Sequence, residues 1–149
     1  MARVLVADDE ERILDFLDTA LTVEGHEVVR ATDGESVLRL AEAVRPDLIL
    51  LDVMMPGMDG LATTRVLRAH ETLHDVPIIM LTALTRDHDF WRGWQSGVDS
   101  YLTKPFELET LHTEIARLGV MVGAEVGERG SLAVLSDIAI GESDLSEED

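Results

Sequence analysis

A short apolar run, Leu48 to Leu51, lies between two prolines and ends at an acidic residue, Asp52. The run has no polar alternation, which is typical of a strand covered on both faces, and such strands belong to parallel sheets flanked by helices. A side chain at the carboxyl end of such a strand opens into the crevice where open α/β sheets bind ligands. Asp52 is therefore a candidate site residue. Taken alone, one Asp is more simply explained as a loop or cap residue. The residues at the other strand ends are needed to tell the two interpretations apart.

The same alternation of apolar runs and helix-period segments continues along the chain. The expected strands are 3–7, 28–29, 48–51, 76–81 and 98–102, and the expected helices are 10–24, 37–44, 61–70, 85–96 and 108–118. Parallel strands need crossover connections, and helices supply them here. The pattern predicts an α/β sandwich with a five-stranded parallel sheet. Periodicity alone leaves the order of the strands open.

Residues 119–149 differ in character from the rest of the chain. Glycines interrupt the first part, and the segment carries eight acids against one arginine, which supplies −7 of the net charge of −18. We therefore divide the chain into a domain at 1–118 and an acidic C-terminal tail at 119–149. A solvated linker is one interpretation of the tail. The other is a docking segment that competes with partners or mediates self-association through its apolar side chains, Leu132, Val134, Leu135 and Ile138.

Length and composition exclude several classes of protein. A chain of 149 residues without cysteine has no disulfides, no thiolate chemistry and no Cys zinc site. The first apolar run is too short for a signal peptide or a membrane span, so we expect a cytoplasmic protein without membrane association. The charge of −18 argues against direct nucleic-acid binding, which needs clustered Lys and Arg, and suits a protein that binds cations.

Polar residues stand at the ends of four expected strands: Asp8 and Asp9, Asp52, Thr82 and Lys104. The carboxyl ends of parallel strands meet at one edge of the sheet, so three carboxylates converge there and need a cation. Mg²⁺ fits best, because it is a hard ion that prefers oxygen ligands. With the ion bound, Asp52 can act as a nucleophile towards an activated phosphoryl group, while Thr82 and Lys104 share the charge on its oxygens.

Four segments in order carry a resemblance to a known family. They are VADDE at 6–10, PDLILLDVMMPGMDG at 46–60, PIIMLTA at 77–83 and GVDSYLTKPF at 97–106. Together they resemble the receiver domain of two-component response regulators over residues 3 to about 118. The resemblance implies a flavodoxin-like (βα)5 fold with strand order 2-1-3-4-5, in a stand-alone receiver.

The resemblance also implies roles for the site residues. Asp52 is expected to accept a phosphoryl group from a histidine kinase or a phosphotransfer protein. Asp8, Asp9, Asp52 and the backbone carbonyl of Met54 are expected to hold Mg²⁺. The protein is then no enzyme in the ordinary sense, because it performs chemistry only on itself.

Three further residues near the strand ends receive roles from the same resemblance. Thr82 and Lys104 are expected to contact the phosphoryl group, and Tyr101 is expected to change rotamer on activation. The bond between Lys104 and Pro105 is expected to be cis, which X-Pro bonds permit at low cost.

The expected output surface covers residues 85–118, with Phe90 as an apolar anchor and Arg86 and Arg92 as charged contacts for the tail or a partner. The nearby Trp91 and Trp94 are expected to pack against the sheet. The effector is expected to be another protein, because the acidic tail cannot supply a basic helix-turn-helix. A homodimer through the 85–118 face is a further expectation.

Three other functions are compatible with parts of the sequence. His70-Glu71-Thr72-Leu73-His74 matches the zinc protease pattern His-Glu-x-x-His, but a strand begins soon after it, and we interpret it as a chance match on an exposed helix end. A haloacid dehalogenase-like phosphatase would need a second Asp at position 54, which is Met. A receiver fold that acts as a scaffold without switching is the third alternative. The remaining histidines, His26, His88 and His112, are predicted to be surface residues.

Overall fold

The structure is a computed structural model, and it describes residues 2–83 and 97–119. The strands are β1 (Arg3–Ala7), β2 (Glu27–Ala31), β3 (Leu48–Asp52), β4 (Ile78–Thr82) and β5 (Ser100–Thr103). The helices are α1 (Glu11–Val23), α2 (Gly34–Val44), α3 (Gly60–Arg68) and α5 (Leu108–Arg117). The expected helix 85–96 and the tail from residue 120 lie outside the described residues.

The five strands form one parallel sheet in the order β2-β1-β3-β4-β5. The order that the resemblance implied is confirmed. β1 and β3 lie at the centre, so the strands that deliver the acidic residues are paired on both sides. Among the described strands β2 and β5 lie at the edges, and β5 pairs only with β4 there.

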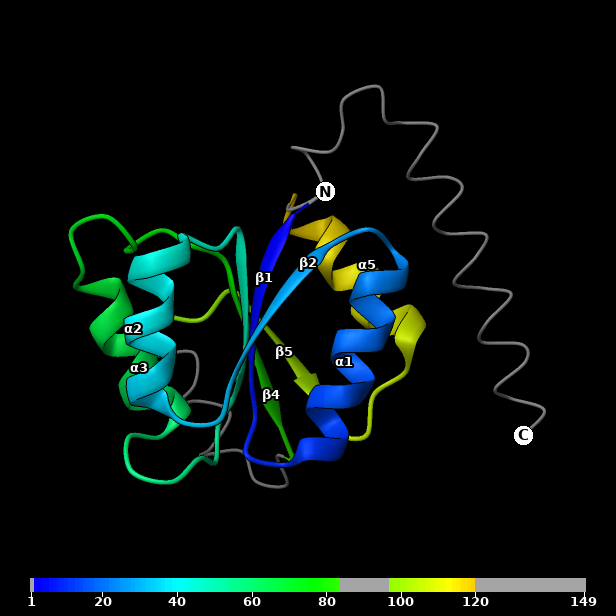
Figure 1. The fold of residues 1–149 in the computed structure, drawn as a ribbon, viewed down its shortest axis with the longest axis horizontal. Helices are drawn as coiled ribbons and strands as arrows, with labels where there is room; N and C mark the ends of the chain where they lie inside the picture. Colours follow the sequence, from blue (N-terminus) through cyan, green and yellow to red (C-terminus); the bar gives the residue numbers. More distant parts are fainter. Residues whose placement is uncertain (1, 84–96, 120–149) are drawn as a thin grey trace.

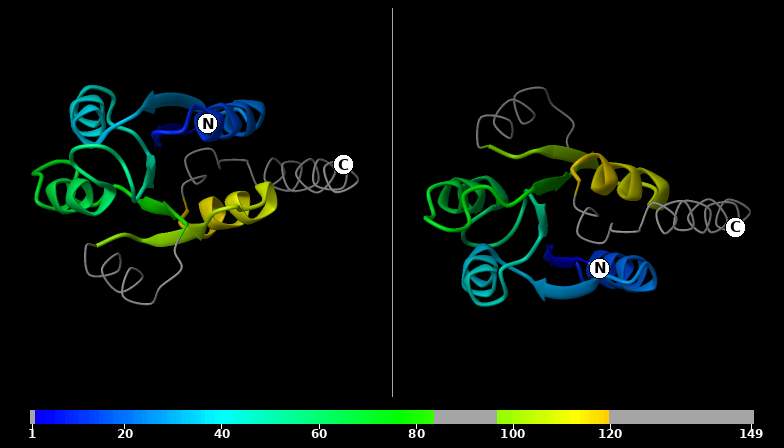
Figure 2. Two further views of the ribbon diagram at one scale, coloured as in Figure 1. Left: turned by 90° about the horizontal axis from the view of Figure 1, so that it is seen from below. Right: turned by 90° about the horizontal axis from the view of Figure 1, so that it is seen from above.

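Helices cover both faces of the sheet, with α1 and α5 on one face and α2 and α3 on the other (Figure 1). The end-on views place the sheet between these two layers (Figure 2). Along β3, Leu48 and Leu50 pack with the α1 and α5 side chains, whereas Ile49 and Leu51 pack with those of α2 and α3. Both faces of β3 are buried, which is the physical reason why its sequence shows no polar alternation.

Two aspartates close to the site act as helix caps. Asp33 accepts a hydrogen bond from Ser36 N at the start of α2, and Asp59 accepts one from Ala62 N at the start of α3. These contacts satisfy backbone N–H groups that have no partner within the helix. Neither aspartate belongs to the group of converging carboxylates.

Among the described residues, the predicted elements were right in kind, and several boundaries were wrong by one to three residues. The helix expected at 10–24 is Glu11–Val23, and the one expected at 61–70 is Gly60–Arg68. The strand expected at 76–81 is Ile78–Thr82, and the one at 98–102 is Ser100–Thr103. The two late strands shift forward because pairing with β3 and β4 selects the residues that enter the ladder. Within the described residues no helix has the length and hydropathy to cross a membrane.

The prediction that the histidines outside the His-Glu-x-x-His match lie on the surface was wrong for two of the three. His26 is buried, and its Nδ1 accepts a hydrogen bond from Ala2 N. The His112 side chain is only 17% exposed and lies 3.6 Å from Glu24. Both face the junction of α1, β2 and α5, a tertiary environment that single-residue patterns do not report. His88 lies outside the described residues.

Candidate functional site

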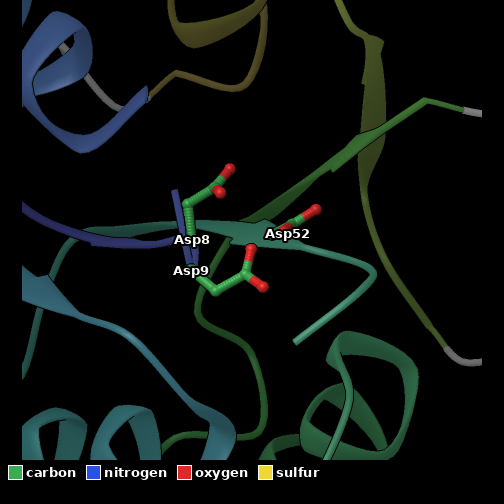
Figure 3. Close-up of side chains that lie close together, drawn as sticks. All are labelled: Asp8, Asp9 and Asp52. Atoms are coloured by element: carbon green, nitrogen blue, oxygen red, sulfur yellow. The ribbon is translucent and has the colours of Figure 1, made fainter. Parts of the chain in front are cut away.

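Three carboxylates converge at the carboxyl edge of the sheet (Figure 3). Asp8 and Asp9 follow β1, and Asp52 ends β3, the neighbouring strand. One carboxylate oxygen from each lies within 4.8 Å of the others, and this is the only such group of three potential metal ligands among the described residues. The Asp8 and Asp52 side chains are buried, whereas Asp9 is exposed. The structure therefore brings the three predicted acids together.

Backbone contacts hold the two buried acids in place. Asp8 N donates to Ala31 O of β2, and the Asp8 side chain accepts from Glu10 N at 2.9 Å. At Asp52, the first residue of α3 lies directly against the strand end. A Cβ on Gly60 would sit 2.2 Å from Asp52 O, so only glycine allows α3 to start at this point.

Lys104 supplies the positive charge of the site. Its Nζ donates to Asp8 Oδ2 at 2.7 Å and to Asp52 Oδ1 at 3.3 Å. The side chain is mostly buried, and Glu10 Oε1 lies 4.0 Å from the same nitrogen. The bond from Lys104 to Pro105 is cis, as the resemblance implied. One ammonium thus faces several carboxylates, which leaves the cluster negative.

The pKa values reflect this imbalance. Burial raises the pKa of Asp52, the charge of Asp8 raises it further, and Lys104 only partly opposes them, so the pKa of Asp52 reaches about 6. For Lys104, burial alone lowers the pKa, but the hydrogen bond to Asp8 and the charge of Asp52 outweigh it and raise the pKa above its ordinary value. The metal-free site therefore binds a proton on Asp52 more readily than a free carboxylate does.

The other predicted residues of this region are near the site or border it. Thr82 is buried at the end of β4, the strand next to Asp52. Tyr101 lies on β5, and burial raises its pKa to about 12. Met54 is 72% exposed, and its N–H donates to Asp52 Oδ1 at 3.4 Å. The expected output residues lie outside the described residues: Phe90, Arg86 and Arg92, with Trp91 and Trp94.

A family model for the response regulator receiver domain matches residues 4–116. The chain belongs to this family. RpaA, described as a DNA-binding dual master transcriptional regulator of Synechocystis sp., is 41% identical to the receiver over 118 residues, which is 79% of this chain and 49% of RpaA. The DNA-binding response regulator MtrA of Mycobacterium tuberculosis is 38% identical over 138 residues, 93% of this chain and 58% of MtrA. The chain thus spans about half the length of these relatives.

Solved receivers share the fold. The chemotaxis protein CheY4 of Vibrio cholerae is 36% identical with a TM-score of 0.75, covering 78% of this chain and 98% of that one. The receiver domain of the sensor histidine kinase PA1611 from Pseudomonas aeruginosa is 34% identical with a TM-score of 0.73, covering 78% and 95% of the two chains. In that structure a magnesium ion is coordinated in the active site cleft.

The His-Glu-x-x-His match does not form a metal site in the described part of the receiver. Residues 69–75 form turns and a bend after the end of α3, so the two imidazoles do not lie one turn apart on a helix. His70 Nε2 lies 2.9 Å from Glu42 Oε2, whereas His74 Nδ1 contacts Glu71 O. The geometry supports the interpretation of a chance match.

Sequence reasoning missed two residues that shape the site. Gly60 was noted only as the end of a motif, although its missing side chain sets how closely α3 approaches Asp52. Glu10 was noted as part of an acidic cluster, and its distance from Lys104 depends on packing between segments 94 residues apart. For Gly60, the one local signal was a glycine at the first helical position after an Asp N-cap.

Proposed function

We propose that this receiver accepts a phosphoryl group on Asp52 in a Mg²⁺-dependent reaction and thereby switches its contacts with other proteins. The observation that carries the proposal is the cluster itself: a buried nucleophilic carboxylate with two further acids and one ammonium at the ligand edge of the sheet. The donor is a histidine kinase or a phosphotransfer protein, which is the general partner class of this family.

The chain's own residues account for each role in the transfer. An Asp52 oxygen attacks phosphorus, the bond from phosphorus to the donor nitrogen breaks, and the nitrogen keeps the electron pair and takes up a proton. Because the pKa of Asp52 is about 6, the carboxylate is mostly ionised at pH 7. We assign to Lys104 Nζ and the Thr82 hydroxyl the role of donating hydrogen bonds to the phosphoryl oxygens. In the dephosphorylation step, water attacks phosphorus and the bond from phosphorus to the Asp52 oxygen breaks. The Asp52 carboxylate is restored, and inorganic phosphate leaves with the protons of the water.

The donor set fits Mg²⁺. All three side-chain ligands are carboxylates, and the raised pKa of Asp52 indicates negative charge that Lys104 does not neutralise. Asp8, Asp9, Asp52 and the Met54 carbonyl would hold the ion. When bound, it supplies charge neutralisation for the phosphoryl oxygens.

Incubation with Mg²⁺ and acetyl phosphate tests the proposal. The intact mass is expected to rise by one phosphoryl group in the wild type and in Asp33→Asn, whose carboxylate caps α2 outside the cluster. Asp52→Asn is expected to stay unmodified. A wild type that never gains the group would instead support the scaffold alternative, and labelling that persists in Asp52→Asn would place the acceptor elsewhere. His70→Ala is expected to be labelled like the wild type.

The output is proposed to be a protein contact through the 85–118 face, with a homodimer as one form of it. The DNA-binding names of RpaA and MtrA refer to longer proteins, of which this chain covers 49% and 58%. For the 149 residues we propose no direct nucleic-acid binding, on the charge argument. Specific, salt-sensitive DNA binding by these residues at physiological ionic strength would contradict it.

The division at residue 118 is also proposed. The family model ends at 116, but the 138-residue match with MtrA extends past it. Removal of residues 120–149 is expected to change oligomeric state or partner affinity if the tail docks on the receiver. No change in either would make the tail a linker.

A further inference from the structure

Arg68, the last residue of α3, forms a clamp at the opposite edge of the sheet from Asp52. Its guanidinium donates from Nε to Gly97 O at 2.8 Å, from Nη1 to Val76 O at 2.7 Å and His74 O at 3.0 Å, and from Nη2 to Asp99 Oδ2 at 2.8 Å. The side chain is 21% exposed. Arg68 thus ties α3 to the segments that begin β4 and β5.

Asp99 holds the start of β5 against β4 and Arg68 through three hydrogen bonds. Its Oδ2 accepts from Arg68 and from Ile78 N at 2.8 Å, and its own N–H donates to Ile78 O. The β4–β5 ladder runs from this point to the other end of the strand, where Lys104 N donates to Thr82 O at 2.7 Å. The same four-residue strand is therefore anchored by Asp99 at one end and carries Lys104 at the other.

β5 needs this anchor more than the strands that carry the acids. β1 and β3 are each paired on both sides, whereas β5 has one neighbour within residues 2–83 and 97–119. An edge strand with one ladder is held less firmly along its length and relies on contacts at its ends. Lys104 Nζ contacts Asp8 at 2.7 Å, and a displacement of about 1 Å is enough to weaken catalysis substantially.

We propose that Arg68 and Asp99 are positioning residues for phosphoryl transfer, which hold β5 so that Lys104 reaches Asp8 and Asp52. The inference rests on the proposed function. It assigns a role in the reaction to an ion pair at the far edge of the sheet, while leaving the Mg²⁺ ligands on β1 and β3 untouched.

The chain contains a matched control clamp. Arg3 at the start of β1 donates from Nη1 to Val44 O at 2.7 Å and from Nε to Glu27, and its backbone N–H donates to Asp47. It lies at the same edge of the sheet as Arg68. Because β1 is held by two ladders, loss of the Arg3 guanidinium is expected to lower stability without moving the site.

Lys104 is the only lysine in the chain, so it can be observed alone. The first measurement is the side-chain NMR signal of protein grown with ε-¹⁵N lysine, without phosphodonor. The wild type and Arg3→Met are expected to give one protected ammonium signal, since Nζ is buried and hydrogen-bonded to Asp8. In Arg68→Met and Asp99→Ala the signal is expected to broaden and to move towards that of a solvent-exposed lysine.

The second measurement compares the labelling rate and the Mg²⁺ dissociation constant in the same variants. With saturating Mg²⁺ and acetyl phosphate, labelling of Arg68→Met is expected to be slower by a factor on the order of ten. The Mg²⁺ dissociation constant from calorimetry is expected to match the wild type, and Arg68→Lys is expected to regain part of the rate by restoring the charge opposite Asp99. Chemical denaturation of all variants verifies that each is folded under the assay conditions.

Several results would overturn the proposal. An unchanged Lys104 signal in folded Arg68→Met would do so, as would an equal loss of rate in Arg3→Met or an equal loss of Mg²⁺ affinity. If the wild type takes up no phosphoryl group, the proposed function fails, and the positioning role fails with it. If the wild type is labelled and Arg68→Met is labelled as fast, only the positioning role fails.

Discussion

The two edges of the sheet differ in how their charged side chains are paired. At the carboxyl edge, Asp8, Asp9 and Asp52 converge on one ammonium, and the pKa of Asp52 is raised to about 6. At the amino edge, Arg3 and Arg68 each meet carboxylates and backbone carbonyls. The amino edge stabilises the fold, whereas the carboxyl edge carries like charges that destabilise it until a cation binds.

The comparison teaches where stability and function lie in this receiver. Repulsion between buried carboxylates costs stability, yet it favours the binding of a cation and, on the proposed function, raises the pKa of the acceptor Asp52. The clamps at the other edge offset that cost. Removing charge should therefore stabilise one edge and destabilise the other.

The largest expected effect is steric and lies at the carboxyl edge. Gly60→Ala places a Cβ 2.2 Å from Asp52 O, which forces α3 away from β3 and is expected to cost about 3 kcal/mol of unfolding free energy. Gly57→Ala is the control, because its φ of +73° is strained but no atom lies within 4 Å; it is expected to cost about 1 kcal/mol. Urea denaturation measures both, and equal losses would contradict a tight fit at Gly60.

Magnesium should stabilise the protein through the carboxyl edge alone. At a concentration one hundred times the dissociation constant, the ion is expected to add about 2.7 kcal/mol to the unfolding free energy. The gain in the midpoint of thermal unfolding should be lost in Asp8→Asn, and it should persist in Asp47→Ala at the other edge. A gain retained in Asp8→Asn would show that the ion binds elsewhere.

Charge removal should act in opposite directions at the two edges. In the presence of EDTA at pH 7, Asp52→Asn is expected to raise the unfolding free energy by about 1–3 kcal/mol. Asp47 accepts from Arg3 N at 2.8 Å, so Asp47→Ala is expected to lower it by about 1 kcal/mol. Denaturation curves of both variants in the same buffer test this contrast. A lower unfolding free energy for Asp52→Asn than for the wild type would contradict it.

The Asp52 effect has a defined pH dependence. The pKa of Asp52 is about 6 in the folded state and 3.8 in the unfolded reference, so the folded state binds more protons between these values. The stability contributed by protonated Asp52 is complete below pH 3.8 and is lost as the pH rises through 6. The advantage of Asp52→Asn should therefore disappear on acidification towards pH 4.

The smallest expected effect comes from His26 at the amino edge, and its sign is opposite. Burial lowers the pKa of His26 below 6.5, with the nearby N-terminal charge as the next cause. Its stability contribution is complete above pH 6.5 and is lost as the pH falls towards the folded pKa. In an Asp52→Asn background, His26→Asn should remove this acid sensitivity, whereas the exposed control His74→Asn should not. A pH profile unchanged by His26→Asn would contradict the assignment.

The sequence by itself determined the alternation of strands and helices and the residues at the strand ends. The run Leu48–Leu51 is apolar throughout because both faces of β3 are covered, and this information is local. Asp8, Asp52 and Lys104 could be grouped from sequence because parallel strands end at the same edge of a sheet. The ordered motifs added the strand order through resemblance, since periodicity alone did not contain it.

Only the tertiary structure decided the features that depend on contacts between distant segments. The burial of His26 and His112, which the sequence placed at the surface, follows from the packing of α1, β2 and α5. The clamp from Arg68 to Asp99 joins residues 31 positions apart. The sequence specifies which side chains are charged, but the fold determines which of them pair, because the free energy of an ion pair depends on distance and burial.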